Sequence, residues 1–359
     1  MTIEQMLGLL GVGVKKGASD IHLEAGYLPA YRIRGELFGA KMDRLTPAET
    51  MLLAQQILRK DDPFLEGSRH DVDRGFGIPG VARFRASIFR QRGSVGLVLR
   101  VIPFEVPSMS ALNLPPIVAS IANARNGLVL VTGSTGNGKS TTIASMLDHM
   151  NKTERAHIVM IEDPIEYTLT PEKSVVIQRE VGTDTESFAT ALRAALRQDP
   201  DVVMVGELRD YETADTCLKA AETGHLVIAS LHTPDVQRTI GRFVGIFSAD
   251  EQLSVRHRLA DNLKAIISLR LIPKQDGSML IPAVEVLLVT RSVQEAIRDP
   301  SRTEGLSALM EKAHDDVKMQ TFDQHLLQLY QAGTINAETA KRVATNRADL
   351  ERALTFGST

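Results

Sequence analysis

The chain lacks the residues and segments on which several classes of protein depend. Its 359 residues include one cysteine, Cys217, and no tryptophan. A single cysteine excludes an internal disulfide and a zinc site built on several thiolates, and it favours a reducing compartment. No apolar run approaches the length of a membrane span, and Glu4 interrupts a weak apolar start, so we expect neither direct membrane insertion nor a signal peptide. The net charge of −3 gives no basic surplus, so we expect no nucleic-acid partner.

The remaining composition is that of an ordinary globular protein with a substantial core. Hydrophobic residues make up 43% and charged residues 24% of the chain. Its length favours two domains, and the proline-rich stretch from Pro103 to Pro116 has the irregular character of a linker. We therefore predict an N-terminal α+β domain over 1–103, a linker over 104–116, an α/β core over 117–289 and a helical region over 290–359.

The N-terminal domain is predicted from short local patterns. A strand-like alternation runs over residues 31–37. Thr46 and Glu49 form a capping box ahead of an apolar-periodic helix. Two further strands are expected over 81–90 and 95–102, with turn glycines between them.

The core is predicted from apolar runs that alternate with helical patterns. This alternation is typical of an α/β fold with a mostly parallel sheet. Asp276 and Gly277 additionally mark a hairpin turn. The four strand runs lie at 128–132, 157–161, 202–206 and 226–231.

The most specific motif is the octapeptide from Gly133 to Ser140, which fits G-x-x-x-x-G-K-[ST] at every fixed position. An apolar strand precedes it and a helical pattern follows it, flanks that a chance match in a glycine-rich turn would lack. Glycines let backbone N–H groups face inward, and the helix N-terminus adds partial positive charge for phosphate. Lys139 would reach the β- and γ-phosphates, and Ser140 would hold Mg²⁺. The predicted nucleotide-binding residues here are Gly133, Ser134, Thr135, Gly136, Asn137, Gly138, Lys139, Ser140 and Thr141.

Polar side chains follow the next three strand runs. Glu162, Asp163 and Glu166 follow the first, Glu207 the second and His232 the third. Singly, each could be an ordinary solvated residue or helix cap. Because ligands bind at the carboxyl ends of strands in open α/β sheets, the set predicts a site for phosphoryl transfer, with His232 as the γ-phosphate sensor. The candidate Mg²⁺ ligands are Ser140, Glu162, Asp163 and Glu207.

Several segments together resemble one known family. They resemble, in order, the motifs of the hexameric ATPases of the type II secretion and type IV pilus superfamily, and most closely its PilT/PilU-type retraction branch. The likeness covers nearly the whole chain. The segments are 18–23, the phosphate loop 133–140, the "Asp box" 161–166, the Walker B signature 205–210, the "His box" 222–233 and the C-terminal helix start 319–324.

The resemblance implies a fold and a mechanism. It implies a PAS-like N-terminal domain, a RecA-like P-loop core and a C-terminal helical region, with six copies in a ring that hydrolyses ATP with Mg²⁺. The family's two acidic residues match Glu166 and Glu207; Glu207 is the first candidate for the principal catalytic carboxylate, and the sequence does not separate their roles. Lys139 and His232 complete the implied catalytic set.

The resemblance also implies a place in the cell and partners. The chain is expected in the cytoplasm, peripheral at the inner membrane through the pilus machine. Its implied partners are copies of itself, the inner-membrane platform protein of the type IV pilus and a paralogous retraction ATPase.

Two arginines of the N-terminal domain have two interpretations. Strand periodicity places Arg83 and Arg85 on one face, opposite Phe84 and its apolar neighbours. In the first interpretation, which needs no ligand, the two arginines simply form a face of the strand that is exposed to solvent. The resemblance instead implies that they approach the nucleotide phosphates like arginine fingers, with Arg92 or Arg100 as further candidates.

The sequence leaves other functions open. The stretch from Glu295 to Arg298 keeps only part of the retraction branch's box, and Pro300 ends that helix early. A pilus-assembly or type II secretion ATPase is one alternative, although the chain has neither the longer N-terminal region nor the cysteine-rich insert of such proteins. A nucleotide-gated accessory subunit of the pilus motor is another, and a DNA-translocating motor conflicts with the net charge.

Overall fold

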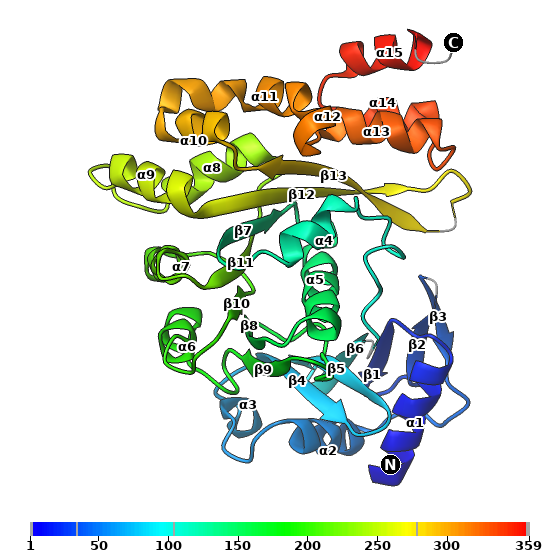
Figure 1. Cartoon of the computed structure of the whole chain (residues 1–359). Helices are drawn as coiled ribbons and strands as arrows, with labels where there is room; N and C mark the ends of the chain where they lie inside the picture. Colours follow the sequence, from blue (N-terminus) through cyan, green and yellow to red (C-terminus); the bar gives the residue numbers. More distant parts are fainter. Residues whose placement is uncertain (1–2, 34, 103–104, 278, 357–359) are drawn as a thin grey trace. The chain divides into compact units, whose positions relative to one another are not determined.

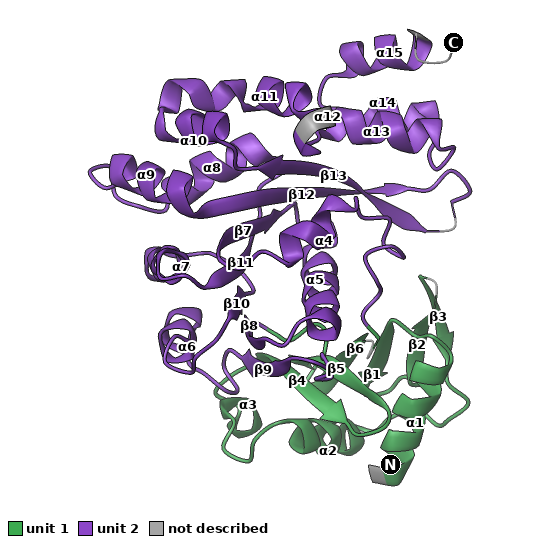
Figure 2. Ribbon diagram, in the orientation of Figure 1, with its two compact units in different colours: residues 1–105, 164–168 green, residues 106–163, 169–359 purple. Residues whose placement is uncertain are grey.

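The computed structural model describes residues 3–33, 35–102, 105–277 and 279–356, which form two compact units (Figure 2). The first unit comprises Met1–Glu105 and Pro164–Thr168, and the second comprises Val106–Asp163 and Leu169–Thr359. Pro103 and Phe104, on either side of the predicted boundary between the N-terminal domain and the linker, lie outside the described residues. The four predicted domain ranges stay a prediction.

The described residues of the first unit form an antiparallel sheet and three helices (Figure 1). Its strand order is β3-β2-β1-β6-β5-β4, and every neighbouring pair is antiparallel. The core lies between the sheet and the helices, around fully buried side chains such as Phe64 and Phe84. The elements are α1 (Ile3–Lys15), β1 (Asp20–Glu24), β2 (Ala30–Ile33), β3 (Glu36–Gly39), α2 (Pro47–Ile57), α3 (Pro63–Glu66), β4 (Asp71–Ile78), β5 (Ala82–Gln91) and β6 (Ser94–Ile102).

Local sequence signals in this unit are mostly confirmed. The predicted capping box is present, because Thr46 Oγ1 accepts a hydrogen bond from the Glu49 N–H while the Glu49 carboxylate accepts one from the Thr46 N–H. Strands β5 and β6 lie where they were predicted. The single strand over residues 31–37 is wrong: β2 and β3 form a hairpin there, and Gly35 has φ of 87°, which its missing Cβ permits.

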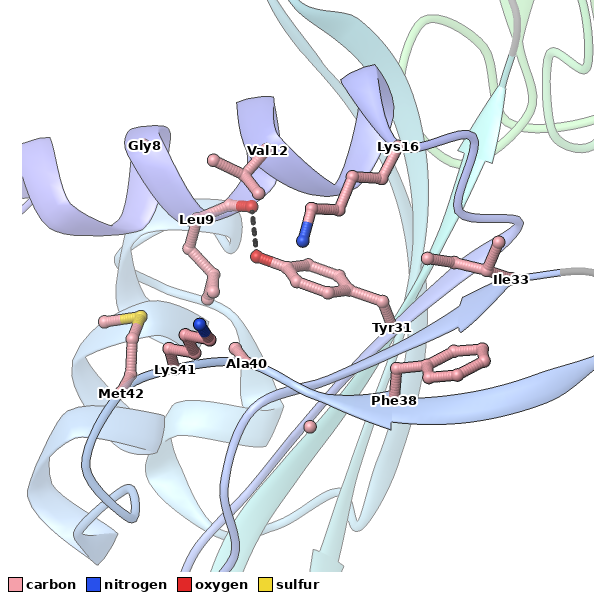
Figure 3. A pocket seen from close by; sticks show the side chains of 11 residues that line it. Gly8, Leu9, Val12, Lys16, Tyr31, Ile33, Phe38, Ala40, Lys41 and Met42 are labelled. Atoms are coloured by element: carbon pink, nitrogen blue, oxygen red, sulfur yellow. Dashed lines mark hydrogen bonds between the residues drawn. The ribbon is translucent and has the colours of Figure 1, made fainter.

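A hollow of about 630 Å³ lies between α1 and the β2–β3 hairpin (Figure 3). The Tyr31 hydroxyl donates a hydrogen bond to the Leu9 carbonyl at 2.9 Å, which joins the strand to the helix. Burial raises the pKa of Tyr31. Apolar side chains line most of the hollow, together with Lys16 and Lys41.

The second unit is built on a seven-stranded sheet in the order β13-β12-β7-β11-β10-β8-β9. All its neighbouring strands are parallel except the β12–β13 hairpin. Helix α5 lies on one face, and α6 and α7 lie on the other (Figure 1). The strands are β7 (Gly127–Thr132), β8 (His157–Glu162), β9 (Val175–Glu180), β10 (Val202–Val205), β11 (Leu226–Leu231), β12 (Leu263–Pro273) and β13 (Leu280–Leu288).

The helices of this unit cover both faces and continue to the C-terminal end. The helical region predicted beyond residue 290 is confirmed for the described residues there, with one 3₁₀ segment beginning at Pro300. The helices are α4 (Ile117–Ala122), α5 (Lys139–Thr153), α6 (Phe188–Ala195), α7 (Tyr211–Glu222), α8 (Val236–Val244), α9 (Gln252–Asn262), α10 (Arg291–Arg298), η1 (Pro300–Gly305), α11 (Leu306–Lys312), α12 (His314–Val317), α13 (Phe322–Gln331), α14 (Ala337–Val343) and α15 (Arg347–Phe356).

Strands β7, β10 and β11 are buried along their whole lengths. Strands covered on both faces are mostly apolar, which explains why these three appear in the sequence as nearly continuous apolar runs. Because β7 to β12 all run parallel, their carboxyl ends meet at one edge of the sheet. The phosphate loop and the polar residues after β8, β10 and β11 follow these ends.

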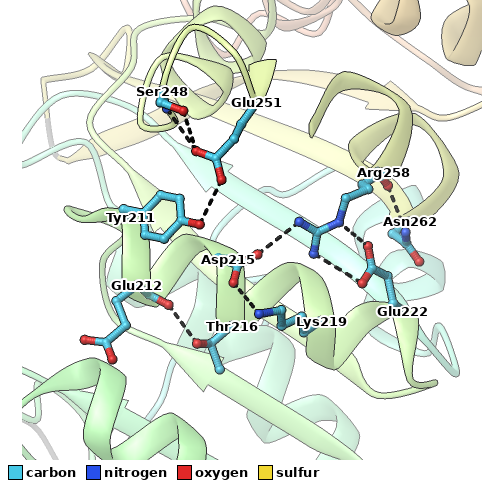
Figure 4. A network of polar contacts seen from close by, with 10 residues as sticks. All are labelled: Tyr211, Glu212, Asp215, Thr216, Lys219, Glu222, Ser248, Glu251, Arg258 and Asn262. Atoms are coloured by element: carbon cyan, nitrogen blue, oxygen red, sulfur yellow. Dashed lines mark hydrogen bonds and ion pairs between the residues drawn. The ribbon is translucent and has the colours of Figure 1, made fainter. Parts of the chain in front are cut away.

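Helices α7 and α9 are joined by a network of polar contacts (Figure 4). The Arg258 guanidinium donates to Asp215 at 3.0 Å and to Glu222 at 2.6 Å, and Lys219 pairs with Asp215 at 2.7 Å.

On the inner side of α7, Cys217 is fully buried, which raises the pKa of its thiol. A thiol that is buried and has a raised pKa is suited to packing rather than to nucleophilic attack. No helix among the described residues is long and apolar enough to cross a membrane.

Candidate active site

The predicted phosphate loop joins β7 directly to α5. Gly136 and Gly138 both have φ of 83°, and Gly138 caps the N-terminus of α5. Gly133 has φ of 148°, and a Cβ there would lie 2.6 Å from the main-chain oxygen of Leu269. This contact leaves no room for a side chain, so the turn after β7 requires glycine. The loop and the helix N-terminus together have the form of an anion-binding cradle.

Lys139 lies over this loop with only 8% of its surface exposed. Its Nζ donates to the Gly133 carbonyl at 2.8 Å and lies 3.3 Å from the Ser134 carbonyl. The Leu271 N–H donates to Asn137 Oδ1 at 3.2 Å, which fastens the loop to β12. The lysine and the loop are therefore held in place by the chain itself.

Glu207 lies in the loop that follows β10. One oxygen of its carboxylate pairs with Arg209 at 2.7 Å, and the other lies 3.2 Å from His232 Nε2. Burial acts to raise the pKa of Glu207, but the hydrogen bonds from Arg209 and His232 and the charge of Arg209 outweigh it and lower that pKa overall. Glu207 is therefore an ionised carboxylate at neutral pH, with 19% of its side chain exposed.

His232 connects the phosphate loop to Glu207. Its Nδ1 lies 3.3 Å from Lys139 Nζ and 3.4 Å from Thr135 Oγ1, while Nε2 faces Glu207. An ammonium group can only donate, so Nδ1 is the acceptor and Nε2 carries the proton donated to Glu207. The structure thus brings together three of the four predicted catalytic residues: Lys139, Glu207 and His232.

The candidate Mg²⁺ ligands have different surroundings. Glu162 is 5% exposed, and its carboxylate accepts a hydrogen bond from Gln178 at 3.1 Å, whereas Asp163 is exposed. Ser140 lies in the first turn of α5, followed by Thr141. Among the described residues no group of three or more His, Cys, Asp or Glu could hold a metal ion by itself. A site completed by nucleotide phosphates fits Mg²⁺, which usually takes one or two protein ligands and several other oxygens.

Other predicted residues lie in the first unit. Glu166 belongs to the segment Pro164–Thr168 and is exposed. On β5 the expected alternation is confirmed, because Phe84 and Ala86 are buried while Arg83 and Arg85 are half-buried. Arg85 pairs with Asp73 at 3.6 Å. The roles of Glu166, Arg83 and Arg85 at a nucleotide stay predictions.

The further arginine candidates and His225 have local contacts. Arg100 pairs with Asp20 at 3.0 Å, and Arg92 has φ of 47° in the turn between β5 and β6. His225 Nδ1 lies 3.0 Å from the Ala220 carbonyl at the end of α7, so it supports that helix end.

Sequence reasoning missed residues that support the site. Arg209 lies within the segment 205–210 but was given no role, although a charged residue two positions after Glu207 was a usable signal. Glu285 lies inside β13 and is only 6% exposed. A charged residue within such an apolar run was a second usable signal of a supporting role. Buried hydroxyls of Thr132, Thr239 and Ser268 gave no signal, because isolated Thr and Ser are common in strands and helices.

Comparisons with known proteins give the same assignment as the motifs. The family model described as "Type II/IV secretion system protein" matches residues 9–279. The chain belongs to this family. It is 42% identical over 341 residues to the type IV pilus retractation ATPase PilT of Pseudomonas aeruginosa, covering 94% of this chain and 97% of that protein. It is 39% identical over 358 residues to the type IV pilus ATPase PilU of the same organism, covering 100% and 92%.

Solved structures of the family match the fold as well. The crystal structure of the pilus retraction motor PilT with bound ADP has a TM-score of 0.89 and 45% identity, covering 98% of this chain and 99% of that one. The ATPase DotB of Legionella pneumophila has a TM-score of 0.84 at 28% identity, covering 96% of both chains. The predicted fold class, a RecA-like P-loop core with a PAS-like α+β domain and a C-terminal helical region, is confirmed. The protein is a nucleotide-binding ATPase of the PilT/PilU type.

Proposed function

We propose that this ATPase is Mg²⁺-dependent and works as a ring of six copies that powers retraction of a type IV pilus. The observation that carries the proposal is the contact of Lys139, His232 and Glu207 beside the phosphate loop. Likeness to PilT and PilU over nearly the whole chain supports the pilus as the machine. Partners follow from the same likeness: the inner-membrane platform protein of the pilus and a paralogous retraction ATPase, which place the ring at the inner membrane.

The chemistry assigned to the site uses groups already in position. Lys139 places a positive charge over the loop that would receive the β- and γ-phosphates. Glu207 is kept ionised by Arg209 and is suited to orient a water molecule for attack. His232 touches both residues and is suited to sense the γ-phosphate. Ser140, with Glu207 or Asp163, would hold Mg²⁺, which would neutralise phosphate charge.

Residues of the first unit complete the proposal. Glu166 is the second acidic candidate, and Arg83 and Arg85 are the candidates for stabilising charge on the transferring phosphoryl group. Rotation of one unit against the other, driven by nucleotide turnover, is the proposed motor step.

Two variants test the catalytic assignment. Lys139→Ala is expected to abolish binding of a fluorescent ADP analogue. Glu207→Ala is expected to keep that binding and to stop phosphate release from Mg·ATP. Parental turnover in Glu207→Ala would remove Glu207 from the mechanism.

A deletion of the gene tests the direction of work. Retraction predicts cells with excess pili and no surface movement. Loss of pili would instead favour an assembly ATPase, the second candidate. Such assembly relatives match a smaller share of this chain, for example 71% for the pilus assembly ATPase PilB of Acinetobacter baylyi.

A further inference from the structure

A chain of buried hydroxyl groups lies under the candidate active site in the second unit. Thr239 Oγ1 lies 2.6 Å from Thr233 Oγ1 and 3.4 Å from Thr132 Oγ1. Thr132 Oγ1 in turn lies 2.8 Å from Ser268 Oγ. Thr132, Thr239 and Ser268 have no exposed surface, and Thr233 is 6% exposed. We call these four residues the hydroxyl ladder.

The ladder has a defined direction at its centre. A threonine hydroxyl carries one proton, and Thr239 Oγ1 donates it to the Asp235 carbonyl at 2.6 Å. Thr239 is therefore the acceptor in its contact with Thr233, and Thr233 is the donor. Since buried hydroxyls without partners are strongly disfavoured, this contact fixes the position of Thr233.

The ladder joins the two chain segments whose contact makes the site. Thr132 is the last residue of β7 and directly precedes Gly133 of the phosphate loop. Thr233 directly follows His232, which touches Lys139 and Glu207. Thr239, in helix α8, accepts the hydrogen bond from Thr233, and its Oγ1 lies 3.4 Å from that of Thr132. Thr239 itself has no described hydrogen bond to Lys139 or Glu207.

A second contact holds the start of α8 in place. The N–H of Val236, the first residue of α8, donates to Glu285 Oε2 at 2.8 Å, and Glu285 pairs in register with Ser268 of the ladder across β12 and β13. Asp235 caps the same helix through the N–H of Arg238. Helix α8 is therefore fixed to the β12–β13 hairpin from one side and to β7 from the other.

We propose that Thr239 is a positioning residue for ATP hydrolysis, which holds His232 against Lys139 and Glu207 through Thr233. This rests on the proposed role of His232. Removing the Thr239 hydroxyl would free the His232 segment without removing any group that touches nucleotide. Displacements of about 1 Å in a catalytic group can lower turnover on the order of a hundredfold.

The test uses the full chain with Thr239→Val, which keeps the shape and removes the hydroxyl, and Thr239→Ser, which keeps the hydroxyl. Thr239→Val is expected to lower kcat for Mg·ATP by roughly tenfold or more with KM nearly unchanged, and Thr239→Ser to restore the parental rate. Thr303→Val is the matched control, because Thr303 is buried in the same unit and donates to the Ala296 carbonyl, not to a residue of the ladder.

The decisive arm repeats Thr239→Val in a His232→Ala background. If Thr239 acts through His232, the second substitution causes no further fall in kcat. An equal fall in both backgrounds, or a parental rate for Thr239→Val, would overturn the proposal. Parental turnover of His232→Ala alone would instead refute the role of His232 in the proposed function. Should Thr239→Val not fold, as judged by thermal unfolding, Thr233→Val takes its place with the same two outcomes, because it removes the donor of the same hydrogen bond.

Discussion

Arg209 controls the ionisation of Glu207, because it supplies the hydrogen bond and part of the charge that lower the pKa of that carboxyl. Arg209→Gln should therefore raise the pKa of Glu207 towards the value that burial favours. Activity falls as the pH drops through this pKa, so the acidic limb of kcat against pH should move to higher pH in the variant. The measurement is phosphate release by the parent and the variant across the acidic limb of the pH profile. An acidic limb that stays in place would contradict this role for Arg209.

Glu285 makes the stability of the second unit depend on pH. Burial raises its pKa from 4.5 to about 7; its neighbours Asp235 and Asp323 act in the same direction, and Arg270 in the opposite one. The folded state therefore holds this proton more tightly than the unfolded state. Stability from this group is fully present below pH 4.5 and is lost as the pH rises through 7.

Glu285→Gln should remove this dependence, because the amide oxygen can still accept from Val236 and does not titrate. We expect the variant to be more stable than the parent by roughly 2–3 kcal/mol at pH 8 and similar to it at pH 4.5. Chemical unfolding at both pH values measures the difference. Burial also lowers the pKa of His325 to about 4, so protonation of this histidine destabilises the folded protein in acid. This effect is the same in the parent and in Glu285→Gln and does not change the difference between them. A constant difference at the two pH values would refute the assignment.

At the scale of elements, the phosphate loop depends on one close backbone approach. Gly133→Ala would place a Cβ 2.6 Å from the Leu269 carbonyl, whereas a Cβ at Gly136 would meet nothing within 4 Å. Both positions have positive φ, so Gly136→Ala is a control for backbone strain alone. We expect Gly133→Ala to lose at least about tenfold more ADP affinity than Gly136→Ala, a difference of about 1.4 kcal/mol. If titrations show equal losses of ADP affinity in the two variants, the close approach of the Gly133 backbone to β12 is unimportant for binding.

Elements differ in how visible they are in the sequence. Strand β10 was predictable because it is buried on both faces and is therefore continuously apolar. Strand β9 was missed because it is an edge strand with exposed and half-buried positions, so its residues show no apolar run. The β2–β3 hairpin was mistaken for one strand because alternation continues across a tight turn.

The same distinction holds for the site. Lys139 and Glu207 were predictable because each lies in a contiguous motif after a strand. The hydroxyl ladder was not, because Thr132 and Ser268 are 136 positions apart and meet only through the pairing of β7 with β12. The sequence predicts the groups proposed to act on a nucleotide, whereas only the fold shows which side chains contact and support them.

At the scale of the whole molecule, the proposed motor requires residues of both units at one nucleotide and six copies in a ring. The variant with both Arg83→Ala and Arg85→Ala should bind the fluorescent ADP analogue like the parent, because the phosphate loop is intact. Its kcat should fall on the order of a thousandfold, the usual effect of losing an arginine that stabilises transferring phosphate. Arg44→Ala is the control, since Arg44 is exposed in the same unit and bonds to the Gly26 carbonyl.

Light scattering separates a catalytic effect of these arginines from an effect on assembly. With Mg·ATP, the parent and both variants should have six times the mass of the 39.3 kDa chain. A slow double variant that still forms the ring places the arginines in the chemistry, whereas loss of the ring would assign them to the contact between copies. Parental turnover by the double variant would refute their role at the phosphates and leave hydrolysis to the second unit, where Lys139, Glu207 and His232 already meet.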